Sequence, residues 1–133
     1  LKSEIDTSKK SLAKQRIDAL VRRNALNEVS LLRFVRDNEP MKFLLGFAAL
    51  IGADANLARK ILADPTGQML VIACRACKIS FEGLKEIASS PMTSMSFGFT
   101  GFVDLSKSYK RITRDDAYEM LHALKLRNKM LSE

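Results

Sequence analysis

Apolar residues recur every three or four positions through most of the chain, which is the spacing of one face of an α-helix. The first such run predicts a helix over about residues 8–23, after a polar lead-in. Its expected inner face consists of Ala13, Ile17, Leu20 and Val21. We expect negligible strand content, so the fold class predicted by the pattern is all-α.

Helix-capping residues divide the rest of the chain. Asn27 and Asp54 are good N-cap residues, Pro40 suits the first turn of a helix, and Gly52 suits the left-handed residue that follows one. Ser80 is a further N-cap residue. Together these signals predict helices that begin near Asn27 and then cover about residues 40–51, 54–63, 69–78, 81–88 and 113–131.

The helical pattern stops between residues 91 and 112, where Gly, Ser, Thr, Met and Phe replace it. A loop of this length is uncommon in a compact domain and is usually functional or mobile. It contains Phe97, Phe99 and Phe102, which either cover the core or dock a partner peptide or helix. Covering the core is the preferred interpretation, because exposed apolar patches of that size are rare on monomers.

The final helix shows the clearest signals. Thr113 and Asp116 resemble a capping box with Asp in place of Glu. Acidic residues in the first turn and basic residues near the end both suit the helix dipole. The expected inner face consists of Ala117, Leu121, Leu124 and Leu131.

A helical pattern recurs at an offset of about 27 residues, which is typical of stacked helical units. Residues 31–37 align with residues 58–64, and a third, weaker copy covers 84–87. The sequence therefore predicts about seven helices in stacked antiparallel hairpins, forming a short repeat-like helical bundle.

Composition indicates one globular domain over residues 1–133, with 47% hydrophobic and 28% charged residues. The apolar stretches 43–51 and 69–74 are shorter than the roughly 20 residues that a membrane span needs, so we expect no membrane insertion. The chain starts with Leu and not with Met, which suggests a fragment of a longer protein.

Cys74 and Cys77 have the Cys-x-x-Cys spacing of a redox pair or of half a metal site. A zinc site needs two more ligands, and the chain has a single histidine. Buried structural cysteines, in a protein of the reducing cytoplasm, are the better interpretation. An enzyme would need Arg75, His122 and nearby carboxylates to meet in one pocket. We therefore expect no catalytic residue, cofactor or metal.

Arg75 is the only charged residue before the end of the predicted helix over residues 69–78, which is otherwise apolar nearly all round. A guanidinium group in such a place has to be paired or to reach solvent. Asp37, Asp64 or carbonyl groups at helix ends are the expected partners. The alternative is that Arg75 binds an anionic ligand.

The net charge is +7 and the isoelectric point is about 9.7, and basic residues gather towards both ends of the chain. Such asymmetry suits an acidic partner, nucleic acid included. Nucleic-acid binding through the basic N- and C-terminal helices predicts that their cations converge on one face. Arg22, Arg23, Lys110 and Arg111 are the main candidates for this surface.

The central region resembles a bacterial helical-repeat family catalogued as domain of unknown function 2336. The residues that carry the resemblance include Leu31-Leu32-x-x-Val35, Phe43-x-x-x-Phe47-Ala48-Ala49-Leu50-Ile51-Gly52, Ala58-Arg59-x-Ile61-Leu62-x-Asp64, and Ala73-Cys74-Arg75-Ala76 followed by Ile79. The resemblance spans roughly residues 17–90. It implies a helical module of a larger bacterial cytoplasmic protein and carries over no catalytic residue.

These observations predict a non-enzymatic protein-interaction or regulatory module of a bacterial signalling-type protein, with an unidentified protein partner. A nucleic-acid-binding helical domain is the alternative, and a homo-oligomer is left open. The candidate interaction residues are Arg75, Phe97, Phe99, Phe102, Arg22, Arg23, Lys110 and Arg111.

Overall fold

The computed structural model describes residues 2–93 and 99–132, and it describes side chains for residues 8–93, 101 and 103–131. Eight helices and no strand occur in the described ranges, so the predicted all-α class is confirmed. The helices are α1 (Lys2–Arg22), α2 (Glu28–Arg36), α3 (Pro40–Ile51), α4 (Ala55–Ala63), α5 (Gln68–Ala76), α6 (Phe81–Ala88), α7 (Phe99–Arg111) and α8 (Arg114–Ser132).

The even-numbered helices α2, α4 and α6 begin at the predicted N-caps. The side chain of Asn27 accepts a hydrogen bond from the backbone N–H of Ser30, and Asp54 and Ser80 accept equivalent bonds three residues ahead. The three caps are 27 and 26 positions apart. The offset in the sequence thus corresponds to regularly spaced helix starts. Gly52 ends α3 with φ +70°, in the left-handed conformation that the sequence predicts.

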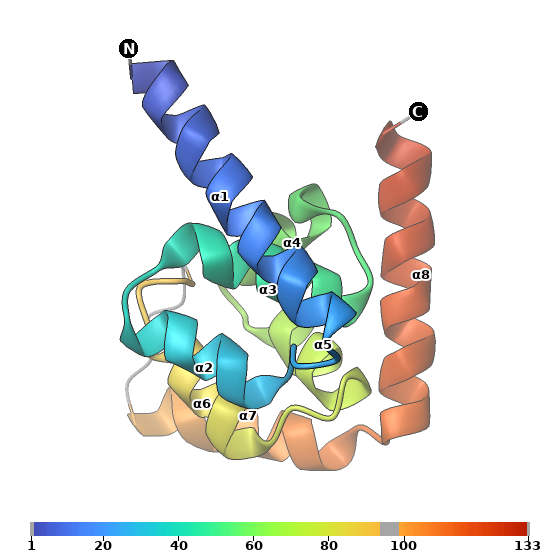
Figure 1. Ribbon diagram of the computed structural model, residues 1–133. Coiled ribbons are helices and arrows are strands. Elements are labelled where there is room, and N and C mark those ends of the chain that lie inside the picture. Colours follow the sequence, from blue (N-terminus) through green and yellow to red (C-terminus); the bar gives the residue numbers. More distant parts are fainter. Residues whose placement is uncertain (1, 94–98, 133) are drawn as a thin grey trace.

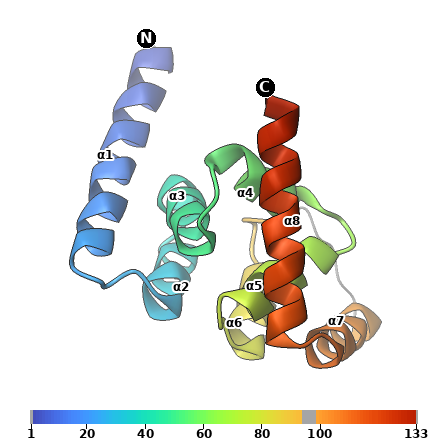
Figure 2. The ribbon, with the colours of Figure 1, turned by 90° about the vertical axis from the view of Figure 1, so that its right-hand side faces the viewer.

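Helices α3 and α5 occupy the middle of the molecule (Figures 1 and 2). α3 packs against α1, α2 and α4, and α5 packs against α4, α6, α7 and α8. α7 lies across the base, α8 rises along one edge, and the N-terminus of α1 and the C-terminus of α8 project towards the same side. No single described helix is long and apolar enough to cross a bilayer; α3 and α4 meet that criterion only as a pair, bent by 104°.

The core forms where the central helices meet. Phe43 and Phe47 of α3 are almost completely buried and their rings stack at 5.8 Å. Between them lies Gly46, where an added Cβ would be only 3.0 Å from the side chain of Leu31 on α2. A glycine at this position therefore allows α2 to approach α3 closely.

The prediction of a loop over residues 91–112 is wrong for most of its length, because α7 covers Phe99–Arg111. Glycine and serine lower the intrinsic helix propensity of this segment, but packing compensates for it. Leu105 is 2% exposed and joins the core, and Tyr109 packs against it four residues later. Tertiary contacts with α5 and α6 therefore select a helix that local propensity does not favour.

Three details of the terminal helices also differ from the prediction. α1 begins at Lys2, so the expected polar lead-in is helical. The spacing predicts Val21 on the inner face of α1 and Leu131 on that of α8, but these residues are 50% and 70% exposed. Leu20, directly before Val21, is only 6% exposed, so Val21 lies beside the covered face of α1, whereas Leu131 lies in the last turn of α8. Apolar spacing locates a face of a helix but does not show how far along the helix a neighbour covers it.

Asn128 on α8 is the only buried polar residue in the described side chains, with 6% exposure. Its amide nitrogen donates to the Asp54 carboxylate at 3.1 and 3.2 Å. Its oxygen accepts hydrogen bonds from Asn56 at 3.2 Å and from Lys60 at 3.4 Å. The C-terminal half of α8 is thereby connected to the first turns of α4.

Candidate interaction surface

A hollow of about 470 Å³ lies between the middle of α1 and the start of α3. We call it the α1–α3 groove. Leu12, Ala13, Pro40 and Met41 give it an apolar floor, and Leu12 is 64% exposed. Its charged residues are Lys9, Glu39 and Lys42. An apolar floor with a charged edge is the usual composition of a peptide-binding groove.

The groove has an excess of positive charge. The Lys42 ammonium group is 2.8 Å from the Glu39 carboxylate, so these two charges largely compensate each other. Lys9 lines the groove as an additional cation, and three more exposed cations lie along the same helix. They are Lys10, Lys14 and Arg16.

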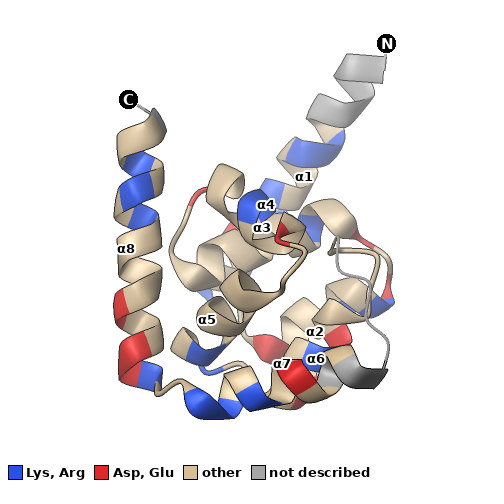
Figure 3. Cartoon of the chain, turned by 180° about the vertical axis from the view of Figure 1, so that it is seen from behind, with Lys and Arg blue, Asp and Glu red and all other residues tan. Residues whose placement is uncertain are grey.

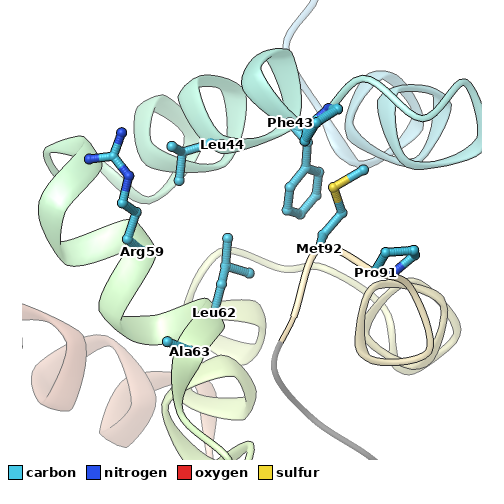
Figure 4. Close-up of a pocket in the computed structure, with 8 residues that line it drawn as sticks. Phe43, Leu44, Arg59, Leu62, Ala63, Pro91 and Met92 are labelled. Carbon is cyan, nitrogen blue, oxygen red and sulfur yellow. The ribbon is translucent and has the colours of Figure 1, made fainter.

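A second hollow of about 260 Å³ lies on the other side of Pro40, which lines both spaces. In Figure 4 the side chains of Phe43 and Leu44 point towards those of Leu62 and Met92 across this space. Arg59, an exposed residue on α4, stands at its edge. The start of α3 therefore separates two adjacent apolar depressions, of which the α1–α3 groove is the larger.

Arg75 has a structural role. Its Nε donates to the carbonyl oxygen of Ile112 at 3.1 Å, just beyond the end of α7, and its guanidinium lies 5.0 Å from the centre of the Tyr109 ring. The Tyr109 hydroxyl in turn donates to the carbonyl oxygen of Ile79 at 2.7 Å. The predicted pairing with a helix-end carbonyl is confirmed, and neither Asp37 nor Asp64 forms an ion pair with it among the described residues.

The other candidate residues are dispersed. Phe97 lies outside the described residues; the backbones of Phe99 and Phe102 belong to α7, but their side chains also lie outside the described part. The choice between core cover and docking segment therefore stays a prediction. Four exposed candidates are found at helix ends: Arg22 and Arg23 at the end of α1, and Lys110 and Arg111 at the end of α7.

The basic residues do not all converge on one face as the nucleic-acid hypothesis predicts. The N-terminal half of α1, with Lys9 and Lys10, lies at the opposite end of the molecule from α7 (Figures 1 and 3). A smaller group forms where α7 meets α8, and all its members are exposed. This basic corner consists of Lys107, Lys110, Arg111 and Arg114.

Cys74 and Cys77 are free thiols near the end of α5. Cys74 is completely buried and Cys77 about half-buried, and burial raises the pKa of both thiols. The Cys77 thiol also lies 3.8 Å from the carbonyl oxygen of Leu50. These positions agree with cysteines that pack as small apolar side chains. His122 is exposed on α8, whereas Cys74 is buried within α5.

Leu12 and Met41 were not among the residues that the sequence singled out. Leu12 directly precedes Ala13, which belongs to the inner face of α1, so its position off that face was visible in the spacing. An isolated exposed leucine is common on protein surfaces. Leu12 becomes part of a groove because the start of α3 lies next to it, and the two come together when α1 packs on α3.

Comparison with known proteins gives one family. A family model described as "uncharacterised protein conserved in bacteria (DUF2336)" matches residues 2–122. The match extends well beyond the region 17–90 that carries the resemblance in the sequence, and it includes α7 and the first part of α8. No curated protein and no solved structure matches the chain.

Proposed function

Since the chain belongs to this bacterial family of uncharacterised proteins, DUF2336, we propose a function from the properties of its own surface. The protein is a non-enzymatic protein-interaction module, and it acts as a scaffold or regulatory domain of a cytoplasmic, signalling-type protein. The observation that carries the proposal is the α1–α3 groove, with its apolar floor and its excess of lysine.

The composition of the groove suits the apolar face of an amphipathic helix of another protein. Leu12 on α1 and Met41 on α3 face the same hollow, so a helix lying between α1 and α3 inserts its apolar residues there. This is the helix-in-groove mode of recognition, in which side chains at positions i, i+3, i+4 and i+7 fill the depression. The burial of apolar side chains supplies the affinity.

Charge determines which helix binds. Lys9 at the groove and the neighbouring cations of α1 attract carboxylates, whereas Glu39 is already paired with Lys42. We therefore propose that the partner helix is acidic on the face that borders its apolar stripe. Complementary charges of this kind raise the association rate and discriminate against basic helices.

The test is photo-crosslinking in bacterial cells with a benzoylphenylalanine at position 12. Position 29 is the matched control, because Leu12 and Val29 are 64% and 67% exposed, and Val29 lines none of the hollows described above. We expect a discrete adduct from position 12 and none from position 29. Mass spectrometry then identifies the crosslinked peptide, which should be an acidic amphipathic helix.

Two further variants connect the adduct to the groove. Met41→Glu puts a charge on the apolar floor but is compatible with folding, because acidic residues are favoured in the first turn of a helix. Lys9→Glu reverses the charge at the edge. Each should abolish the adduct. Equal adducts from positions 12 and 29, no adduct at all, or an adduct that survives Met41→Glu would refute the proposal.

Nucleic-acid binding through the basic corner is the second candidate. Lys110 and Arg111 lie in the corner with two other exposed cations, and such clusters bind phosphates in a salt-dependent way. Electrophoretic mobility shift with a 30-base-pair DNA and RNA duplex tests it. Retardation at low salt that is lost in Lys110→Glu/Arg111→Glu supports this function, and an absence of retardation excludes it.

A further inference from the structure

Helix α8 carries a second apolar surface, which is separate from the α1–α3 groove. Met120, Ala123, Leu126 and Met130 lie three or four positions apart and therefore share one side of the helix. All four are exposed, and Met120, Leu126 and Met130 retain 47%, 51% and 75% of their accessible surface. We call these residues the α8 stripe.

The stripe lies away from the face that packs on the molecule. Ala117 and Leu121 are buried against α5, as is Asn128 near α4. In Figure 2, which looks onto this edge of the molecule, α8 runs along the front with no other element covering it. Another helix can therefore lie along the stripe without displacing any part of the fold.

Charge is distributed unevenly along α8. Asp115, Asp116 and Glu119 lie in its first part, and Lys125, Arg127 and Lys129 lie in its second part, all following Arg114 at the start of the helix. Figure 3 shows this as acidic residues near the base and basic residues nearer the free end. The helix thus has an acidic half and a basic half on either side of Ala123.

We propose that two copies of this chain associate through their α8 helices in an antiparallel, two-fold symmetric pair centred on Ala123. In such a pair each residue faces the one at the same distance on the other side of the centre. Glu119 then faces Arg127 of the second copy, and the reverse contact forms as well. Self-complementarity of this kind is what a two-fold interface requires.

The apolar positions nearest the axis follow the same symmetry, whereas Met130 lies level with Asp116 of the second copy. Met120 faces Leu126 of the second copy, and the small side chain of Ala123 allows the two helices to approach closely at the axis. A parallel pair would instead place acidic residues against acidic and basic against basic, at an unfavourable Coulomb energy. The charge pattern therefore selects both the occupant, a second copy, and its orientation.

The expected dimer is weak and reversible. The stripe from Met120 to Met130 is about 15 Å long at the rise of an α-helix, so the interface lies at the small end of the range for specific complexes. Dissociation in the micromolar range is expected. This inference does not depend on the proposed function, because the groove and the stripe are on different helices.

The test is sedimentation velocity of the 133-residue chain from about 5 to 500 μM, with circular dichroism to verify folding. The wild-type chain should pass from monomer to dimer within this range. Glu119→Arg and Arg127→Glu should each raise the dissociation constant at least about tenfold, because each places like charges opposite one another twice. An equimolar mixture of the two variants should recover the dimer, since opposite charges then face each other again.

Arg33→Glu on α2 is the matched control: it changes the net charge as Arg127→Glu does, at an exposed site on a helix that contributes to neither the α1–α3 groove nor the stripe. It should leave the dissociation constant within about twofold of the wild-type value. A wild-type chain that stays monomeric at 500 μM refutes the proposal. A dimer unaffected by Arg127→Glu, or a variant mixture that stays monomeric, refutes the antiparallel pairing.

Discussion

Replacing Arg75 by methionine should be tolerated better than replacing it by alanine. Both variants lose the hydrogen bond from Nε to the Ile112 carbonyl and the contact with the Tyr109 ring. A hydrogen bond from a charged donor is worth about 1.5 kcal/mol at the lower end of its range, which suits a half-buried side chain. A cation over an aromatic ring adds about 0.5 kcal/mol. Arg75→Met should therefore cost about 2 kcal/mol.

Alanine removes the aliphatic part of the side chain as well. Each buried methylene contributes about 0.8 kcal/mol, and the stem of Arg75 is only partly covered, so Arg75→Ala should cost about 1 kcal/mol more than Arg75→Met. Methionine keeps this packing and places its sulfur near the Tyr109 ring. Urea unfolding at pH 7, with unchanged m-values, measures both differences.

Two controls locate the effect. Arg33→Met removes an exposed cation on α2 and should change the free energy of unfolding by less than about 0.5 kcal/mol. Tyr109→Phe keeps the ring under Arg75 and removes only the hydrogen bond to the Ile79 carbonyl, at a cost of about 1 kcal/mol. Equal losses for Arg75→Met and Arg75→Ala would refute the packing argument. An Arg75→Met variant as stable as wild type would refute the role of the Ile112 bond.

Two further predictions concern helix starts. Partial burial raises the pKa of Asp64, but hydrogen bonds from the Met69 N–H and from Thr66 outweigh it and lower the pKa. The stability from these bonds is therefore present at neutral pH and is lost as the pH falls below about 4. Asp64→Asn should lower the free energy of unfolding by about 1 kcal/mol at pH 7. At pH 2 the variant and the wild-type chain should be equally stable, as measured by urea unfolding. Replacing a glycine inside a helix by alanine usually stabilises a protein, but Gly83→Ala should lower the free energy of unfolding by about 1 kcal/mol, because the added Cβ would lie 2.9 Å from Cδ of Glu28. Thermal unfolding measures this loss.

Each of the two predictions, for Asp64→Asn and for Gly83→Ala, has a result that would contradict it. If Asp64→Asn differs from wild type by the same amount at both pH values, the carboxylate charge is not the cause. Glu28 accepts hydrogen bonds from the backbone and hydroxyl groups of Ser80, so the penalty for Gly83→Ala should largely disappear in a Glu28→Ala background. A penalty that persists there would assign the crowding to Ile79 instead.

Local signals predicted much of the fold because they act over three or four residues. The bounds of α3 and α6 and the caps at Asn27, Asp54 and Ser80 follow from proline, glycine and polar capping side chains. These local signals did not predict the start of α1 or any part of α7. α7 has weak local propensity and depends on contacts between Leu105 and residues that are distant in the sequence, which single-sequence periodicity cannot show.

The candidate site was harder to predict than the fold. The sequence identified Arg75 correctly as an unusual residue with an internal partner, but the partner, Ile112, lies 37 positions away. It did not identify the α1–α3 groove, because Leu12 and Met41 come together only when α1 packs on α3. A concave surface belongs to two elements at once, and no window along one helix contains it.

The buried amide of Asn128 has a consequence for the evolution of this chain. Its partners are at the start of α4, so α8 has one position along its axis in which this amide is satisfied. Sliding α8 by a turn would leave a polar group unpaired in an apolar setting, which is costly. An insertion or deletion between Ala117 and Asn128 should therefore be selected against more strongly than one after Asn128. In this way a single asparagine constrains the number of residues between Ala117 and Asn128 as well as the axial position of the helix.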